Sequence, residues 1–185
     1  MGDRRTVKTR SAIKEAFLRL LERKSINNIT VAEISELADI GRGTFYLHYR
    51  DIYDLYENIE NEVFGQLGSF YDASFPSENH PVSLLAYIEQ STEYIYENKK
   101  IFALLINRAN NTLTLQKLKE LFKSKIVHII SIMSEGKVSE YDTVVTAFVI
   151  SGVVGVLEEW IGTGMVKTPR QISEILHKVL LKLDF

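Results

Sequence analysis

Residues 30–55 read TVAEISELADIGRGTFYLHYRDIYDL, and this stretch carries the clearest structural signal in the chain. Thr30 and Glu33 form a capping box, because the threonine hydroxyl accepts from a first-turn amide while the glutamate reaches back to the cap. The box predicts a short helix over residues 31–38. A second short helix, over residues 42–49, follows after a turn of only three or four residues. Such a turn is too short for antiparallel packing, so the two helices must cross steeply, as they do in a helix-turn-helix.

The apolar positions around this stretch predict a small three-helix core. Over residues 6–24 apolar side chains recur every three or four positions, which indicates a first amphipathic helix that forms the third wall of the core. The inward residues of the helix pair are Val31, Ile34, Ala38, Ile40 and Phe45. The second helix of the pair presents residues that can reach base edges, thymine methyl groups and phosphates in a major groove. These outward residues are Arg42, Thr44, Tyr46, Leu47 and His48.

The charge of the chain is unevenly distributed. Residues 1–24 contain eight basic and three acidic side chains, which gives +5, and the other 161 residues contain 14 basic and 21 acidic ones, which gives −7. A basic end on an acidic body fits a phosphate-binding segment attached to a body that does not touch nucleic acid. A solvated, charged helix face explains the same numbers equally well.

The remaining segments also have helical periodicity. Asp51 is expected to cap a long helix that reaches about residue 75, and Thr168-Pro169-Arg170-Gln171 has the residues of a helix start. No alternating strand pattern bounded by turns is present. The sequence therefore predicts an all-α fold of about nine helices, with a three-helix helix-turn-helix domain over residues 1–52 and a helical domain over residues 53–185. The further predicted helices cover residues 81–97, 99–109, 112–134, 139–163 and 168–183.

Composition and motifs exclude several classes of protein and site. The chain has no cysteine, which excludes disulfides and thiolate metal sites and suits a reducing cytoplasm. No Ser/His/Asp arrangement, phosphate loop or zinc-binding HExxH helix is present, so neither an enzyme nor a bound cofactor or metal is expected. No apolar run approaches about 18 residues, and the polar start contains no secretory signal. We therefore expect a cytoplasmic protein without a membrane partner.

Residues 6–55 resemble the TetR/AcrR family of regulators. The family pattern has a threonine-valine start to its second helix, then alanine-glycine-valine-serine, a glycine-threonine pair, a tyrosine and a histidine-phenylalanine pair. The matching residues here are Thr30-Val31, Ile34, Ala38, Ile40, Gly43-Thr44, Tyr46 and His48-Tyr49. The resemblance implies a DNA-binding transcription regulator, by default a repressor that a small-molecule effector releases from a palindromic double-stranded DNA operator.

The resemblance also implies roles for individual residues. Thr30 would contact a phosphate, and Arg42 and Gly43 would approach bases, with Arg42 able to bond guanine bidentately. Thr44, Tyr46 and His48 would contact phosphates and base edges, beside the outward Leu47.

Three positions depart from the family pattern. Asp39 replaces the turn glycine and Gly41 replaces the capping serine, but aspartate tolerates the left-handed conformation and glycine is an acceptable N-cap. Ile52 stands where many members have a lysine that grips phosphate at the start of the fourth helix. Arg50 is the predicted substitute for that lysine.

The second domain is interpreted mainly through the same resemblance, which implies an effector pocket and a dimer. Its aromatic residues suit a pocket between helices, although ordinary core packing explains any one of them equally well. The predicted pocket residues are Phe64, Tyr71, Tyr94, Phe102 and Phe122. The helices over about 141–163 and 169–183 are predicted to form a four-helix homodimer seam, because the first is apolar nearly all round and contains small residues. An intramolecular core is the alternative for this pair.

Two further functions stay open. The closing stretch LEEWIGTGMVKTP resembles the branch of the family that includes the dihydroxyacetone kinase regulator, which keeps a transcriptional activator or co-regulator as an alternative to a repressor. A non-transcriptional DNA-binding or adaptor protein could use the same helix-turn-helix.

Overall fold

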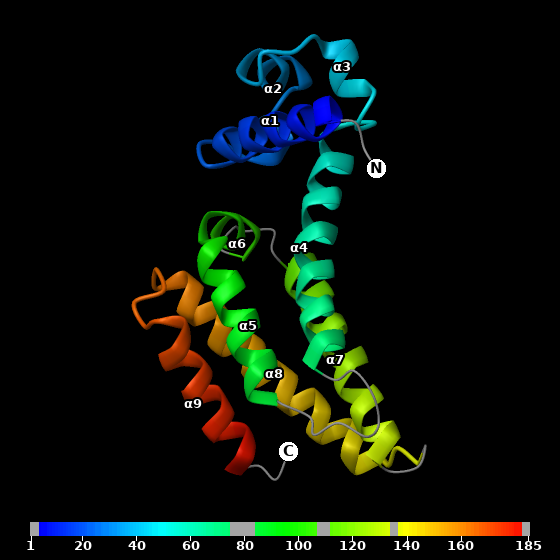
Figure 1. The fold of residues 1–185 in the computed structure, drawn as a ribbon, viewed down its shortest axis with the longest axis vertical. Coiled ribbons are helices and arrows are strands. Elements are labelled where there is room, and N and C mark those ends of the chain that lie inside the picture. Colours follow the sequence, from blue (N-terminus) through cyan, green and yellow to red (C-terminus); the bar gives the residue numbers. More distant parts are fainter. Residues whose placement is uncertain (1–3, 75–83, 107–111, 134–136, 183–185) are drawn as a thin grey trace. The chain divides into compact units, whose positions relative to one another are not determined.

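The structure is a computed structural model that describes residues 4–74, 84–106, 112–133 and 137–182. Over these residues the fold is all-α, as predicted, with nine α-helices, one short 3₁₀ helix and no strand (Figure 1). The predicted helix ends at residues 75, 81–83, 107–109, 134 and 183 lie outside the described residues. The helices are α1 (Arg4–Leu21), η1 (Ile26–Asn28), α2 (Val31–Leu37), α3 (Arg42–Tyr46), α4 (Ile52–Ser74), α5 (Leu84–Glu97), α6 (Lys99–Ile106), α7 (Thr112–Met133), α8 (Glu140–Gly162) and α9 (Pro169–Lys182).

The chain divides into two compact units, Met1–Val63 (unit 1) and Phe64–Phe185 (unit 2), so α4 contributes residues to both. The predicted domain boundary after residue 52 coincides with the start of α4. It stays a prediction about where the functional parts of the chain divide.

Unit 1 has a core that joins all four of its α-helices. Its central side chains are fully buried, with exposed fractions of 0%: Ile13, Phe17, Ile34, Phe45 and Leu55. Helix α2 packs against both α1 and α3. The predicted three-helix core therefore forms, and Leu55 adds the first turns of α4 to it.

Helix α3 ends at Tyr46, three residues before its predicted end. The backbone tightens there, because the amide of His48 donates to the carbonyl oxygen of Phe45 at 2.9 Å, a contact typical of a 3₁₀ turn. Tyr49 is buried beside Phe45, with 5.8 Å between ring centroids, so the chain turns inward at this point. Leu47 and His48 consequently belong to a turn rather than to the recognition helix itself.

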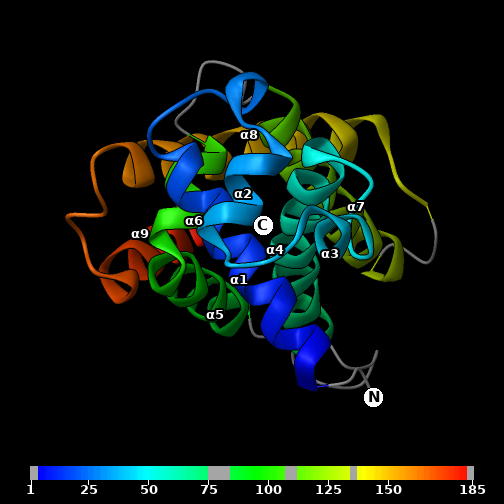
Figure 2. The ribbon, with the colours of Figure 1, turned by 90° about the horizontal axis from the view of Figure 1, so that it is seen from above.

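In unit 2, α5 packs against α9, and α8 is packed by α6 and α7 (Figures 1 and 2). The predicted start of α9 is confirmed: the backbone amide of Thr168 donates to Gln171 Oε1 at 2.9 Å, and the amide of Gln171 donates to Thr168 Oγ1 at 3.3 Å. Trp160 fixes the loop before it, because its indole Nε1 donates to the carbonyl oxygen of Lys167 at 2.9 Å.

Helix α8 corrects one expectation from the sequence. An 18-residue window of this helix has a mean hydropathy of 1.8, so α8 is long and apolar enough to cross a membrane by length and composition alone. The expectation that no apolar run approaches this length was wrong, because threonine, serine and glycine interrupt the run of apolar letters without lowering the mean hydropathy far. Within unit 2, 39% of that window is buried, which is the pattern of a helix that packs on one side only.

Candidate nucleic-acid interface

The start of α2 is fixed by the predicted capping box. The amide of Glu33 donates to Thr30 Oγ1 at 3.3 Å, and the amide of Thr30 donates to Glu33 Oε2 at 3.0 Å. Lys24 Nζ adds an ion pair to Glu33 Oε1 at 2.5 Å. The bonds from Lys24 and then from Thr30 lower the pKa of Glu33 to about 2, so this carboxylate stays charged at neutral pH.

The same box restricts how Thr30 can act on DNA. Its hydroxyl donates to Glu33 Oε2 at 2.7 Å, and a hydroxyl has only one hydrogen to donate. A phosphate oxygen only accepts, so a phosphate contact from this hydroxyl requires it to turn away from Glu33. The contact stays a prediction, and the backbone start of α2 does not depend on it.

The turn between α2 and α3 tolerates both departures from the family pattern. Asp39 adopts a left-handed conformation with φ of 52°, and the amide of Ile40 donates to the carbonyl oxygen of Ser35 at 2.9 Å. The amide of Asp39 also donates to the carbonyl oxygen of Glu36 at 3.2 Å. These two backbone bonds form a Schellman motif that ends α2. Gly41 is the N-cap of α3 in an extended conformation, and a Cβ built there meets nothing within 4 Å. The backbone therefore does not require glycine at position 41.

The predicted recognition residues lie at the solvent-facing side of α3 and the turn after it. Tyr46 and Leu47 are 58% and 82% exposed, although both carry large apolar groups that proteins usually bury at least in part. Arg42 and Gly43 are exposed as well, whereas Thr44 and His48 are half-buried. Phe45 and Tyr49 point into the core. The structure thus brings all six predicted recognition residues, Arg42, Gly43, Thr44, Tyr46, Leu47 and His48, onto one short segment with accessible polar and apolar groups.

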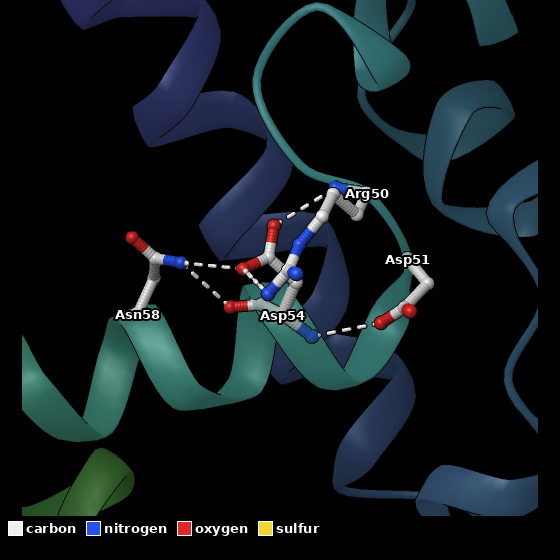
Figure 3. Close-up of polar contacts among 4 residues, drawn as sticks. All are labelled: Arg50, Asp51, Asp54 and Asn58. Atoms are coloured by element: carbon white, nitrogen blue, oxygen red, sulfur yellow. Dashed lines mark hydrogen bonds and ion pairs between the residues drawn. The ribbon is translucent and has the colours of Figure 1, made fainter.

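The corner between α3 and α4 is held by a polar cluster around Asp54 (Figure 3). Asp51 caps α4 as predicted, since its Oδ1 accepts from the amide of Asp54 at 2.8 Å. Asp54 Oδ2 accepts from the backbone amide of Arg50 at 2.8 Å, and this bond is the main reason why the pKa of Asp54 is lowered. Arg50 Nη2 lies 3.4 Å from Asp54 Oδ1, and the Arg50 side chain is 82% exposed. Ile52 is half-buried and offers no polar group.

Two contacts near this segment were not predicted from the sequence. The hydroxyl of Tyr53, in the first turn of α4, donates to Asn27 Oδ1 in η1 at 3.0 Å. The guanidinium of Arg10, on α1, lies 5.9 Å from the ring centroid of Tyr49. Neither pair has a local sequence signal, because the partners are 26 and 39 residues apart. Both bring polar or cationic groups to the elements that flank the recognition segment.

The predicted pocket residues of unit 2 fall into two aromatic groups. Tyr94 contacts Phe102, with 6.0 Å between centroids, while Tyr71 and Phe122 both contact the ring of Tyr87, at 5.8 and 6.4 Å. Phe64 is buried on α4 and has no ring contact in the described part of the chain. The two groups are consistent with core packing and with a pocket wall, so the pocket residues stay a prediction.

The Tyr71 group also contains the main polar contacts between α4 and α7. The hydroxyl of Tyr71 lies 3.0 Å from the carbonyl oxygen of Lys125 and 3.2 Å from His128 Nδ1. Lys125 Nζ forms an ion pair with Asp72 at 2.7 Å. Burial raises the pKa of Tyr71, so its hydroxyl remains a hydrogen-bond donor at neutral pH. Across the described residues, no group of three or more His, Asp or Glu is arranged to hold a metal ion.

Helices α8 and α9 leave apolar side chains exposed. On α8 the exposed fractions are 77% for Tyr141, 63% for Val144 and 70% for Phe148, and on α9 they are 43% for Ile175 and 51% for Val179. A Cβ built on either exposed glycine of α8, Gly152 or Gly155, meets nothing within 4 Å. These residues form one apolar stripe on each helix, which is called the α8/α9 face below.

Comparison with known proteins covers both units. Residues 13–59 match the model for bacterial regulatory proteins of the tetR family, and residues 83–182 match a model for a transcriptional regulator C-terminal region. The chain is 30% identical over 100 residues to the uncharacterized HTH-type transcriptional regulator YxbF of Bacillus subtilis (strain 168). That match covers 53% of this chain but 26% of the relative, so the chain spans about a quarter of that protein.

Two solved structures are similar over almost the whole chain. A TetR transcriptional regulator from Streptococcus agalactiae 2603V has a TM-score of 0.67 at 24% identity, covering 98% of this chain and 96% of that one. The dihydroxyacetone kinase operon activator DhaS has a TM-score of 0.68 at 16% identity, covering 95% of each chain. At these identities the likeness establishes the fold and leaves effector and operator open.

Proposed function

The chain belongs to the tetR family of bacterial regulatory proteins, and on that premise we propose that it is a repressor which leaves a palindromic operator when a small-molecule effector binds. Family membership makes it a DNA-binding transcriptional regulator rather than an enzyme. The observation that carries the proposal is the recognition segment from Arg42 to His48. Three of its large side chains, Arg42, Tyr46 and Leu47, are exposed on a well-packed helix-turn-helix, which is expected of residues that a DNA groove will cover.

The proposed division of work within the interface follows the chemistry of each side chain. Arg42 reads a guanine through O6 and N7, and Leu47 contacts a thymine methyl group. Tyr46, His48 and Arg50 contact phosphates, which fix the register of the segment in the groove without reading sequence. A Cβ built on Gly43 meets no other atom within 4 Å. Any need for glycine at this position therefore comes from the approach of DNA and not from the fold.

We propose that the α8/α9 face is the homodimer seam. Exposed apolar stripes of this kind mark surfaces that another protein covers. The glycines at positions 152 and 155 let a helix of a second protomer approach closely. A two-fold dimer would present its two recognition segments to half-sites about 34–36 Å apart, or one helical turn of DNA. We place this dimer on DNA in the cytoplasm, with α8 covered by protein and not by lipid.

The dimer proposal is tested by Phe148→Glu in sedimentation-velocity experiments. The added charge on the α8/α9 face should convert the dimer to a monomer at micromolar concentration. Val166→Glu is the matched control, because Val166 is 84% exposed but lies after α8, outside this face. A Phe148→Glu protein that remains dimeric would refute the assignment.

We propose that the effector binds between the helices that carry the two aromatic groups of unit 2. Release of DNA requires that the effector prefers the conformation that does not bind the operator. Because such coupling is reciprocal, operator DNA must weaken effector binding by the same factor. Isothermal titration of the effector into the free protein and into its operator complex measures this factor, and equal effector affinity in the two titrations would refute the mechanism.

Two alternatives, an activator and an architectural DNA-binding protein, are distinguished from a repressor by the sites that the protein occupies and by its effect on transcription. DhaS is described as an activator, and its similar fold keeps activation open for this chain. Sequences that the full chain selects from random DNA give a consensus, which can then be located in the genome. A repressor gives a consensus within one or a few promoters and raises their transcription when the gene is deleted. If the protein is an activator, deletion of its gene lowers the transcription of those promoters. An architectural protein occupies many sites without a consensus.

A further inference from the structure

The start of α4 has very little positive charge. Arg50 is the only lysine or arginine between Arg42 and Lys99, and α4 itself contains five acidic residues and no basic one. Affinity for the DNA backbone comes largely from cations that neutralise phosphates. A charged phosphate contact from the stretch between α3 and the end of α4 therefore depends on Arg50.

Arg50 is poorly placed to make such a contact unaided. It precedes α4, and its side chain is 82% exposed, so little packing restricts its rotamers. A long side chain that is free in the unbound protein loses conformational entropy when it binds. The geometry around Asp54 reduces that freedom.

Asp54 is held independently of the Arg50 guanidinium. Its side chain is only 17% exposed. Its Oδ2 accepts from the Arg50 backbone amide at 2.8 Å, and its Oδ1 lies 3.3 Å from Asn58 Nδ2. The amide of Asp54 is bonded to Asp51 at 2.8 Å. The carboxylate is thus a fixed anchor on the first turn of α4, and Figure 3 shows the Arg50 guanidinium beside it.

We propose that Asp54 is a positioning residue that holds the Arg50 guanidinium over the first turn of α4, ready for an operator phosphate. The inference rests on the proposed DNA-binding role of Arg50. A guanidinium has five N–H donors in a planar fork, and only Nη2 meets Asp54, at 3.4 Å. The remaining donors stay available to a phosphate oxygen. Because an exposed ion pair of this length is weak, Asp54 orients the guanidinium without sequestering it.

The proposal predicts that removing the Asp54 charge weakens DNA binding, which is opposite to the effect expected from charge alone. Removing an acid from a DNA-binding surface ordinarily strengthens binding, because phosphate repulsion falls. We expect Asp54→Asn, which keeps an acceptor for the Arg50 amide, to weaken binding of a duplex carrying the selected consensus by about fivefold at about 0.1 M salt. The slope of log affinity against log salt should shrink by up to about 1.8, because each protomer of the proposed dimer contributes one phosphate contact of about 0.9. Asp54→Ser serves as a second uncharged variant, since serine also accepts hydrogen bonds at this helix position.

The matched control is Glu57→Gln, which removes an exposed acid one turn further along α4. We expect this variant to bind the duplex as tightly as the parent protein or slightly more tightly. Thermal unfolding and sedimentation of each variant verify that the fold and the dimer are kept.

A double-mutant cycle separates positioning from a merely structural role. Asp54→Asn should have no further effect in an Arg50→Ala background, because the group that it positions is gone. Unchanged or tighter binding by both Asp54 variants would overturn the inference, and so would losses that multiply in the double variant. If Arg50→Ala keeps the parent salt slope, the phosphate contact and this inference fail together. The proposed DNA-binding function would still stand if Arg42→Ala loses operator binding.

Discussion

Unit 1 and unit 2 differ in how far apart along the chain their proposed functional residues lie. In unit 1 these residues run from Thr30 to Arg50, and one capping box, the Asp51 cap, a Schellman turn and one helix pair position them. In unit 2 the proposed pocket residues run from Phe64 to Phe122 on four helices, and contacts such as Tyr71 to Lys125 join them. A site made from neighbours in the chain is specified by short-range spacing, whereas a site made from distant segments depends on how helices pack.

The largest expected effects come from deleting one fully buried ring in each unit. Phe45 and Phe102 both have an exposed fraction of 0%. Each change to alanine should lower the free energy of unfolding of its own unit by about 3–5 kcal/mol. We expect Phe45→Ala to lose operator binding and keep the dimer, and Phe102→Ala to weaken the body that dimerises. Hydrogen exchange resolved by segment, together with sedimentation, measures the two effects; loss of the dimer in Phe45→Ala would show that the units do not fold separately.

Next in size is the effect of the recognition residues on binding. Arg42→Ala should weaken operator binding by about 1–3 kcal/mol per half-site and relax the preference at one base pair of each half-site, because a bidentate guanine contact is lost there. Tyr46→Ala should weaken binding to all sequences more evenly. Both side chains are exposed, so melting temperature and dimerisation should not change. Competition binding on a set of single-base operator variants tests this, and parent-like affinity in both variants would refute the assignment.

A smaller effect on stability is expected from substitutions at Asp39 in unit 1 and at Gly164 in unit 2, where the backbone adopts a left-handed conformation. Asp39 has φ of 52° and Gly164 has φ of +80°. Asp39→Gly should stabilise unit 1 by up to about 1 kcal/mol, because it relieves the clash of Cβ in this conformation. Gly164→Ala should destabilise unit 2 by about 1 kcal/mol for the same reason. Chemical denaturation of both variants gives the comparison, and changes of the same sign would contradict it.

The smallest effect concerns the acid sensitivity of the two capping boxes that contain a carboxylate, at the starts of α2 and α8. Glu33 belongs to the capping box of α2 and has its pKa lowered to about 2, mainly by Lys24, while bonds from Ser139 lower the pKa of Asp142 in the capping box of α8. A carboxylate whose pKa is depressed in the folded state stabilises that state above its unfolded pKa, and this stabilisation is lost as the pH falls through the folded value. For Glu33 the loss should occur between about pH 4.5 and pH 2. Lys24→Met should raise the pKa of Glu33 and leave that of Asp142 unchanged, which carboxylate NMR titrations can measure.

Most of unit 1 could be predicted because its signals are local. The capping role of Thr30, the inward Phe45 and the N-cap Asp51 all follow from spacings of one to four residues, and the structure confirms each. The pairing of Arg50 with Asp54 also spans four residues, but the sequence pattern drew attention to the missing lysine and not to the acid that follows it. The end of α3 was predicted too late, because burial of Tyr49 and the tight bond at His48 turn the chain.

For unit 2 the sequence predicted the individual helices but not how those helices pack against one another. The sequence identifies α8 as apolar nearly all round, but it does not say which residues face α6 and α7 and which form the α8/α9 face. The apolar character of α8 was underestimated, because threonine, serine and glycine interrupt its run of apolar residues without lowering its mean hydropathy far.

The amino-acid order alone therefore specifies the all-α class, the helix-turn-helix and the segment from Arg42 to His48. Caps, turns and helix periodicity act over about four residues, so they can be recognised without coordinates. The tertiary structure was needed for the bond between Tyr53 and Asn27, for the contacts of Tyr71 with α7 and for the exposed α8/α9 face. These features join residues distant in the chain, and no local pattern determines which distant side chains will meet when the core packs.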